Sequence, residues 1–312
     1  MPPKDRRHGP RGPPIGQAPP ARGHHAAGAP MTAPEIIRFF EQSRLRDLAS
    51  FRTLCNALKA LVIEAAVGAW RRQCKGRMTV LDLGCGRGGD LRKWAGYRVK
   101  SFCGLDGSVP SIREARERQE ALVAQGQSSV VADFRVVELT TQRIPLADGS
   151  VDVVSCMFFL QFAFAGAAAA QHVVGEVARV LRPGGVFCAI LPDGDRIARV
   201  LAGGPGLLPF GHFKLRRLYE PARARSAQPP VGLAYDFMLS DQACTEFLVS
   251  QAYLRDLLQQ RGLAEFSAES AQVVFERHGD SEAAALVLKD QRCSHIDWLS
   301  LGFFTVVFAR RE

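Results

Sequence analysis

Glycines follow an acidic strand end in the stretch "VLDLGCGRGGDLRKW", which begins at Val80. Gly84, Gly86 and Gly89 fit the spacing GxGxxG, in which a bare backbone turns tightly and lets a cofactor approach closely. That spacing alone also fits a dinucleotide site. Asp82, just before the glycines, would repel a pyrophosphate. The stretch therefore favours a ligand that carries a positively charged centre.

A second acid lies at the expected end of the next strand. Asp106 follows Asp82 by 24 positions, as one strand–helix–strand step allows. A carboxylate at that place can accept both hydroxyls of a ribose. An adenosine with a cationic tail satisfies both demands, so the sequence predicts S-adenosylmethionine as the cofactor, with an ordinary NAD site as the alternative.

The elements that must position these acids alternate along the chain. Apolar runs predict strands at 78–84, 99–106, 134–139, 151–157 and 186–192. Helical periodicity or capping residues predict helices at 35–74, from 89, and at 108–125, 167–181 and 195–201. This alternation is typical of a Rossmann-like α/β fold: a doubly wound, mostly parallel sheet with helices on both faces.

The pattern changes after residue 202. Residues 203–243 are rich in Gly, Pro, Arg and Ala and predict a small β-rich insertion, with a strand at 233–239. A helix is predicted over 246–261, closed by Gly262, and a last strand over 302–309. We expect one domain over 35–312. Residues 1–34 form a Pro- and Gly-rich basic tail that cannot bury enough surface to fold, and it is predicted to be disordered.

Composition excludes several classes of protein. The chain is 47% hydrophobic and 23% charged, which indicates a globular core, and no apolar run of about 20 residues predicts a membrane span. Its eight cysteines lack CxxC spacing, which indicates free thiols and argues against a metal site. The tail supplies +4 of the net charge of +9. It is either a solubilising segment or a loose contact for an anionic polymer.

Longer stretches resemble one family. "GCGRGGDLRKW" resembles the GCGKGGDLxKW run of mRNA cap guanine-N7 methyltransferases, and "LRPGGVF" resembles the segment before the fifth strand of class I methyltransferases. "NALKALVI", "DGSVPSIREARER", "VDVVSCMFFLQFAF" and "LPDGDRIARVL" resemble that family's NWIKSxLI, DIAxxSIxxAxxRY, FDxVSCQFxxHYxF and PDxxxIxxxL. "PFGHF", "YDFML" and "EFLV" resemble its FGN, YxFxL and EYLV. The resemblance covers the chain from about residue 37 to its end.

The resemblance implies a class I methyltransferase that transfers a methyl group from S-adenosylmethionine to guanine N7 of the 5′ GpppN cap of mRNA. Guanine N7 already carries a lone pair, so the attack needs no general base, and rate comes from alignment of the reacting atoms. No catalytic side chain and no metal is therefore predicted. The alternatives are a methyltransferase of another nucleotide or small molecule, and a non-catalytic RNA-binding subunit.

The family's cofactor contacts fall on strand ends and on the first helix. Lys59 would contact the carboxylate of the cofactor. Glu138, at the predicted end of the third strand, would lie near the adenine, with Asp133 as its competitor. The implied cofactor set is Lys59, Asp82, Gly84, Gly86, Asp106, Glu138, Met157 and Phe162.

For the cap, the resemblance implies that Glu246 holds the guanine edge. A carboxylate accepts from both the guanine N1–H and its N2 amine, which adenine does not offer. Arginines would lie near the triphosphate, although each also fits a solvated surface charge. Without the resemblance, Glu246 fits an acid at the start of a helix. The implied cap set is Cys55, Asn56, Arg87, Arg92, Arg118, Gln161, Phe162, Glu246 and Phe304.

Four positions depart from the family pattern. Met157 stands for its Gln, and Gln161 and Phe162 stand for its His-Tyr pair. The family's C-terminal Tyr aligns with Phe304 or, on another anchor, with Thr305. A phenylalanine ring can still stack on a purine, which is worth about 1–3 kcal/mol, but it cannot donate a hydrogen bond. Ordinary core packing is the alternative for both rings.

The resemblance also implies partners. These are the capped 5′ end of mRNA, with an RNA guanylyltransferase/triphosphatase or an activating subunit. We expect a monomer with no membrane contact, in the nucleus, or in the cytoplasm for a viral protein.

Overall fold

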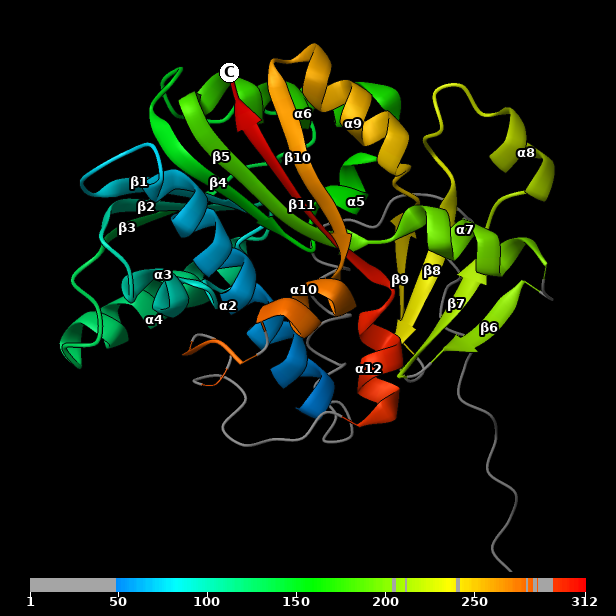
Figure 1. Cartoon of the computed structure of the whole chain (residues 1–312), viewed down its shortest axis with the longest axis horizontal. Coiled ribbons are helices and arrows are strands. Elements are labelled where there is room, and N and C mark those ends of the chain that lie inside the picture. Colours follow the sequence, from blue (N-terminus) through cyan, green and yellow to red (C-terminus); the bar gives the residue numbers. More distant parts are fainter. Residues whose placement is uncertain are drawn as a thin grey trace, which may run out of the picture.

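Two β-sheets form the framework of the computed structural model, which describes residues 49–203, 206–210, 212–239, 242–278, 280–282, 285 and 294–312. One sheet has seven strands in the order β10-β11-β5-β4-β1-β2-β3, and the other has four in the order β6-β7-β8-β9 (Figure 1). The predicted tail and the beginning of the predicted helix at 35–74 lie outside the described residues.

The centre of the large sheet is parallel. It consists of β1 (Met78–Leu83), β2 (Val99–Asp106), β3 (Val131–Val136), β4 (Val151–Met157) and β5 (Leu181–Pro192). At one edge, β11 (Phe304–Arg311) runs antiparallel to β5, and β10 (Leu263–Ser270) pairs antiparallel with β11. The predicted doubly wound, mostly parallel sheet is confirmed. Its strand order reverses at β1, so the carboxyl ends of β1 and its neighbours are the expected ligand edge.

Helices cover both faces of this sheet (Figure 1). One face carries α2 (Ala49–Arg71), α3 (Leu91–Ala95), α4 (Val109–Ala124), α10 (Ala271–His278) and α12 (His295–Leu301). The other carries α5 (Leu160–Ala163), α6 (Ala167–Val180) and α9 (Gln251–Gln260). Successive strand residues alternate between the two cores: Val80 packs in the first and Leu81 in the second.

Helix α2 is the central helix of the first face. By length and composition alone it could cross a membrane. Leu54, Leu58 and Leu61 on it are nevertheless buried in the hydrophobic core. It packs on β4 and β5 and against α10 and α12. Its apolar character is therefore that of a core helix of the fold.

The small sheet is antiparallel and follows α7 (Gly194–Ala202). It contains β6 (Leu207–Phe210), β7 (Phe213–Arg217), β8 (Ala234–Leu239) and β9 (Gln242–Phe247), with α8 (Pro221–Ser226) between β7 and β8. The ring of Phe213 lies 5.5 Å from that of Phe303 and 6.5 Å from that of Phe304. The small sheet is thereby joined to the start of β11.

Several predicted boundaries are wrong. The third strand ends at Val136, so Glu138 follows it by two residues. The fifth strand begins at Leu181, directly after α6, and contains the Pro-Gly-Gly turn signal that was expected to precede it. Glu246 belongs to strand β9, not to a helix start, because α9 begins at Gln251 after its Ser250 cap. Strand β10 was not predicted.

Candidate active site

The chain turns sharply where β1 ends. Gly84 and Gly86 have φ values of +66° and +51°, a region that favours glycine. A Cβ on Gly84 would lie 2.5 Å from the Cβ of Phe159, whereas a Cβ on Gly86 would meet no described atom within 4 Å. The turn is closed against the β4–α5 connection at Gly84, whereas the space beside the Cα of Gly86 is free for a ligand.

Asp82 is buried immediately before this turn, with 2% of its surface exposed. It pairs in register with Ser155 on β4, and the Ser155 hydroxyl donates a 2.6 Å hydrogen bond to its Oδ1. Burial raises the pKa of Asp82 to about 7, and repulsion by Asp90 adds to the rise. A positive charge on a ligand would favour the ionised form. This agrees with the predicted preference for a cationic centre.

Lys59 does not project freely from α2. Its Nζ donates to Oδ2 of Asp90 at 2.9 Å, and Lys93 Nζ donates to Oδ1 of the same carboxylate at 2.6 Å. Lys93 also donates to Oδ1 of Asn56 at 3.1 Å. Burial tends to raise the pKa of Asp90, but the two lysines outweigh it and hold that pKa well below its usual range. The Asp90 carboxylate and Lys93 thus link the predicted cofactor residue Lys59 to the predicted cap residue Asn56.

Asp106 holds the glycine turn against the end of β2. Its Oδ2 accepts from the Gly86 N–H and its Oδ1 from the Ser108 N–H, both at 2.9 Å. Burial raises the pKa of Asp106 in spite of these two donors, and Glu138 adds to the rise. Each carboxylate oxygen keeps a further lone pair for a ribose hydroxyl. The free space beside Gly86 and the two acids Asp82 and Asp106 therefore fit the predicted S-adenosylmethionine.

Asp133 and Glu138 differ in their distance from the carboxyl end of β3. Asp133 lies within β3, opposite Cys103, and forms an ion pair with Arg135. It is three residues short of the strand's carboxyl end, or about 10 Å. Glu138 lies just beyond that end, close enough to Asp106 to influence its pKa, and its Oε1 accepts from the Thr140 hydroxyl at 2.7 Å. Of the two, Glu138 is at the ligand edge.

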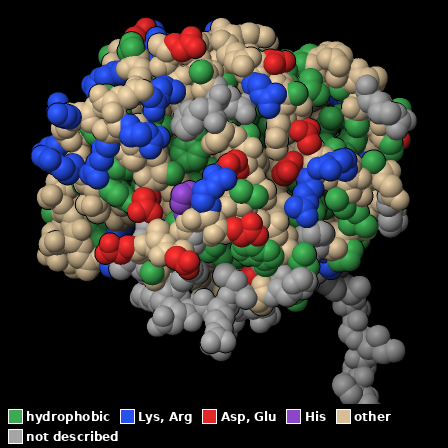
Figure 2. All heavy atoms as spheres, viewed as in Figure 1, with side chains coloured by type: hydrophobic (Ala, Val, Ile, Leu, Met, Phe, Trp, Pro, Cys, Tyr) green, Lys and Arg blue, Asp and Glu red, His purple; other side chains and the backbone are tan. Residues whose placement is uncertain are grey.

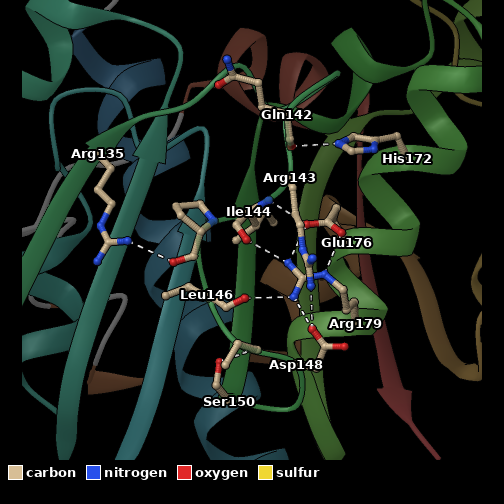
Figure 3. A network of polar contacts seen from close by, with 12 residues as sticks. Arg135, Gln142, Arg143, Ile144, Leu146, Asp148, Ser150, His172, Glu176 and Arg179 are labelled. Carbon is tan, nitrogen blue, oxygen red and sulfur yellow. Dashed lines mark hydrogen bonds and ion pairs between the residues drawn. The ribbon is translucent and has the colours of Figure 1, made fainter.

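The loop that begins at Glu138 is fastened to α6 (Figure 3). Arg179 donates to both carboxylate oxygens of Glu176 at 2.7 Å, to the Ile144 and Leu146 carbonyls at 2.9 Å, and to Asp148 at 2.6 Å. Glu176 in turn accepts from the Ile144 N–H at 2.7 Å. One arginine on α6 therefore holds the loop through two of its backbone carbonyls and the Asp148 carboxylate.

Glu246 is a buried carboxylate surrounded by neutral donors. It is 4% exposed. The Tyr235 hydroxyl donates to its Oε2 at 2.6 Å, and Gln161 Nε2 donates to its Oε1 at 3.3 Å. Burial raises the pKa of Glu246 to about 7, although both donors oppose the rise. Among the described residues, no Lys, Arg or His forms a salt bridge with Glu246.

Gln161 joins α5 to this carboxylate. Its Nε2 also donates to the Phe158 carbonyl at 3.0 Å, which fixes the orientation of the amide. Its Oε1 is buried and has no hydrogen-bond partner among the described residues. A buried acceptor without a donor is costly unless a ligand supplies one. Gln161 therefore offers a ligand an acceptor beside Glu246.

Phe158 is a site residue that the sequence did not reveal. It follows β4 with a φ of +66°, which is unusual for a non-glycine residue, and such strained residues cluster at functional sites. Its ring meets that of Phe304 edge-on at 5.1 Å, and Lys59 Nζ lies 5.6 Å from its centroid. Phe304 itself is 5% exposed and stacks on Phe51 at 6.3 Å. Phe158 therefore contacts both a predicted cofactor residue, Lys59, and a predicted cap residue, Phe304.

Two other predicted residues at the end of β4 differ in exposure. Met157 is buried in the core, with 5% of its surface exposed. Phe162 on α5 is half-buried, and its ring lies 6.3 Å from that of Phe159. The partly open ring of Phe162 remains available to a ligand, whereas Met157 packs as a core side chain.

The predicted basic residues occupy the glycine turn and the helices beside it. Arg87 forms an ion pair with Glu114 at 3.2 Å. Arg92 and Arg118 are exposed and form no ion pair with a described residue. Cys55 is half-buried, and burial raises the pKa of its thiol to about 12, so it remains protonated. The arginines can serve phosphates, and the thiol packs as a small apolar group.

Comparison with known proteins identifies the family to which the chain is similar. Residues 37–293 match the mRNA (guanine-N(7))-methyltransferase domain. The mRNA cap guanine-N(7) methyltransferase of Caenorhabditis elegans is 31% identical over 217 residues, which cover 67% of this chain and 57% of the relative. The mRNA cap guanine-N(7) methyltransferase 1 of Arabidopsis thaliana is 30% identical over 196 residues, 59% of this chain and 52% of the relative. The chain spans just over half the length of these two relatives.

A solved structure shares the fold. An S-adenosylmethionine-dependent methyltransferase from Clostridium acetobutylicum superposes with a TM-score of 0.52 at 12% identity, over 90% of this chain and 99% of that chain. At that identity the likeness concerns the arrangement of strands and helices.

Proposed function

This chain belongs to the mRNA (guanine-N(7))-methyltransferase family, whose domain it matches over residues 37–293, and on that premise we propose that it methylates guanine N7 of the GpppN cap of mRNA. S-adenosylmethionine supplies an electrophilic methyl group: the N7–carbon bond forms as the carbon–sulfur bond breaks, and the positive charge passes from sulfur to the guanine. No proton is removed, so the reaction asks no site residue to act as a general base.

The observation that carries the proposal is the environment of Glu246. An ionisable carboxyl is buried there without a cationic partner among the described residues, which is costly for folding. Such groups concentrate at functional sites, where a ligand compensates them. A guanine edge offers the N1–H and the N2 amine as two adjacent donors. These donors suit the Glu246 oxygens and the free acceptor of Gln161.

The cofactor would lie between the glycine turn and the first helix. Lys59 would contact the cofactor's carboxylate, Asp106 would accept from the ribose hydroxyls, and Glu138 would lie near the adenine. Asp82 stabilises positive charge near the reacting methyl, because its ionised form is favoured when a cation is near. Phe158, Phe162 and Phe304 supply ring faces on which the purine can stack. The residues themselves therefore align the two reactants and exclude water.

Further partners and the cellular location are part of the proposal by family analogy. We expect a capping enzyme or an activating subunit to associate with the chain, and the protein to reside in the nucleus. Co-purification of the tagged full-length chain and imaging in cells of its own species test these two expectations.

Methyl transfer itself is tested with labelled S-adenosylmethionine and two RNAs that differ only in a GpppA or an ApppA cap. We expect label in N7-methylguanosine after nuclease release, from the GpppA substrate only. Binding of the cofactor without transfer to either RNA would support another acceptor or a missing subunit. Failure to bind the cofactor would support a non-catalytic RNA-binding role.

A further inference from the structure

A group of basic residues lies outside the site described above. The sequence contains no acid between Glu64 and Asp82, and none between Asp90 and Asp106. These two acid-free stretches carry six exposed cations near the amino ends of β1 and β2, which we call the amino-end patch: Arg71, Arg72, Lys75, Arg77, Arg98 and Lys100.

Backbone contacts bring the two stretches together. The Met78 N–H donates to the Arg98 carbonyl at 3.0 Å, and an Arg77 guanidinium nitrogen donates to the Val99 carbonyl at 2.9 Å. Arg71 lies 5.9 Å from the centroid of the Tyr97 ring. The α2–β1 and α3–β2 connections are therefore neighbours, and their cations share one surface. Figure 2 shows Lys and Arg side chains gathered on the side where Figure 1 draws β1 and the end of α2.

The charge of this patch is not neutralised by described residues. None of its six cations forms a salt bridge with a described acid, whereas the adjacent Arg182 is paired with Asp152 at 2.6 Å. Two acids, Glu64 and Glu282, lie at the border of the patch, near Tyr97. Burial is the main cause of the raised pKa of the Tyr97 hydroxyl, and the two acids add to the rise. Arg71 has a structural role at the carboxyl end of α2, whose helix dipole favours a cation. The Arg77 side chain has a structural contact too, with the Val99 carbonyl, whereas the side chains of the other four cations form no hydrogen bond or ion pair with a described residue.

We propose that the amino-end patch binds the phosphodiester backbone of the single-stranded RNA that follows the cap. Clustered, unneutralised Lys and Arg side chains are the general means by which proteins hold nucleic-acid phosphates. The patch lies at the amino ends of β1 and β2, whose carboxyl ends carry the glycine turn of the cofactor site. The length of β1 separates the patch from that turn by roughly 20 Å, so a transcript of several nucleotides is needed to reach from the cap residues beside the turn to the patch.

This inference rests on the proposed function only for the identity of the RNA, since binding to the patch requires no methyl transfer. It predicts that the patch is not selective for base sequence, because it offers charge rather than groups directed at base edges. It also predicts that a cap dinucleotide is bound without help from the patch.

The test uses the full chain with Arg72, Lys75, Arg98 and Lys100 all replaced by Gln, which spares Arg71 and the Arg77 backbone contact. A matched control replaces four exposed arginines elsewhere by Gln: Arg113, Arg199, Arg255 and Arg277. Fluorescence anisotropy with an uncapped RNA of about 20 nucleotides is measured between about 50 and 200 mM salt. Polyglutamate is the second probe, and thermal unfolding establishes that both variants are folded.

We expect the patch variant to bind RNA at least about tenfold more weakly at low salt, with a log–log salt slope smaller by about 3, from roughly 0.7 per lost contact. The control should keep the slope of the unmodified chain. Methylation of the GpppA dinucleotide should be the same in all three proteins, while the KM for a long capped RNA rises only in the patch variant.

Equal RNA affinity and slope in the patch and control variants would overturn the proposal. So would equally tight, equally patch-dependent binding of polyglutamate, which would identify a surface for acidic protein. If the unmodified chain does not methylate GpppA, the proposed function fails, yet the anisotropy data still decide whether the patch binds RNA.

Discussion

Tyr235 and Glu246 face each other across strands β8 and β9, and the tyrosine hydroxyl donates a 2.6 Å hydrogen bond to the carboxylate. Both side chains are buried. Burial, followed by the neighbouring Glu246, keeps the pKa of Tyr235 well above its ordinary value, so the hydroxyl is always a donor. The pair therefore fixes one oxygen of a carboxylate that is almost completely buried.

Replacement of Glu246 by Gln should stabilise the fold. The pKa of Glu246 rises from an ordinary 4.5 to about 7 on folding, so the folded chain holds this proton more tightly than the unfolded chain. Its contribution to the free energy of unfolding therefore falls as the pH rises from about 4.5 to 7. Urea unfolding of Glu246→Gln should show a gain of about 1–3 kcal/mol at pH near 8, and a smaller gain at pH near 5. A gain that does not change with pH would contradict the raised pKa, and Glu117→Gln is the exposed control.

Replacement of Tyr235 by Phe should move the pH dependence of cap methylation. The tyrosine hydrogen bond favours the ionised form of Glu246, so its loss raises the pKa of that carboxyl above about 7. If ionised Glu246 binds guanine, kcat/KM for GpppA falls on the acid side of that pKa, and the midpoint should lie at higher pH in Tyr235→Phe. An unchanged midpoint would show that another group, such as Asp82, controls the profile.

Asp90→Asn should weaken binding of the amino-acid end of the cofactor. The carboxylate holds Lys59 at 2.9 Å, and a neutral amide would hold it less firmly. Calorimetry should show weaker binding of S-adenosylhomocysteine, but unchanged binding of 5′-methylthioadenosine, which lacks the amino-acid group. Lys59→Met should give the same selective loss. Equal weakening of both ligands would instead indicate that Asp90 shapes the whole pocket.

Two alanine substitutions in the glycine turn should have different effects. Gly84→Ala combines an unfavourable positive φ with a Cβ 2.5 Å from the Cβ of Phe159, and we expect a loss of stability of about 3 kcal/mol. Gly86→Ala meets no described atom and should cost only about 1–2 kcal/mol for its φ of +51°, yet should weaken cofactor binding. Chemical denaturation and calorimetry separate the two. Normal cofactor affinity in Gly86→Ala would place the ligand elsewhere.

The backbone at Phe158 should be strained. Glycine adopts a φ of +66° without the cost that a side chain pays, so Phe158→Gly should be more stable than Phe158→Ala by about 1 kcal/mol. Both lose the ring contact with Phe304, which makes Ala the matched reference. Equal stability of the two variants would contradict the left-handed conformation.

Local patterns predicted the part of the site built from one continuous segment. The strand–glycine–helix stretch from β1 to β2 is read directly from apolar runs and glycine spacing, and the structure places Asp82, Gly86 and Asp106 together there. Their roles toward a ligand stay predictions. The helix predicted at 108–125 is α4, and the Ser108 hydroxyl caps it by accepting from the Ser111 N–H.

The rest of the site depends on contacts between distant segments. Glu246 was expected at a helix start because "EFLV" runs into a helical pattern, but pairing with Tyr235 holds it in a strand. The Lys59–Asp90 pair joins residues 31 positions apart, and nothing in the local sequence sets it. Phe158 has no sequence signal, since a positive φ in a phenylalanine arises only from its surroundings. "LAEFSAES" is too polar to read as a strand, and its pairing with β11 makes it one.

The most direct measurement is the rate of methyl transfer from labelled S-adenosylmethionine to a GpppA cap by the unmodified chain and by Glu246→Gln, with the product identified as N7-methylguanosine. The expected result is transfer by the unmodified chain and a loss of at least about a hundredfold in Glu246→Gln, which retains cofactor binding but lacks the carboxylate that accepts from guanine. Transfer at equal rates by both proteins would contradict the assignment of Glu246 as the residue that binds the guanine of the cap.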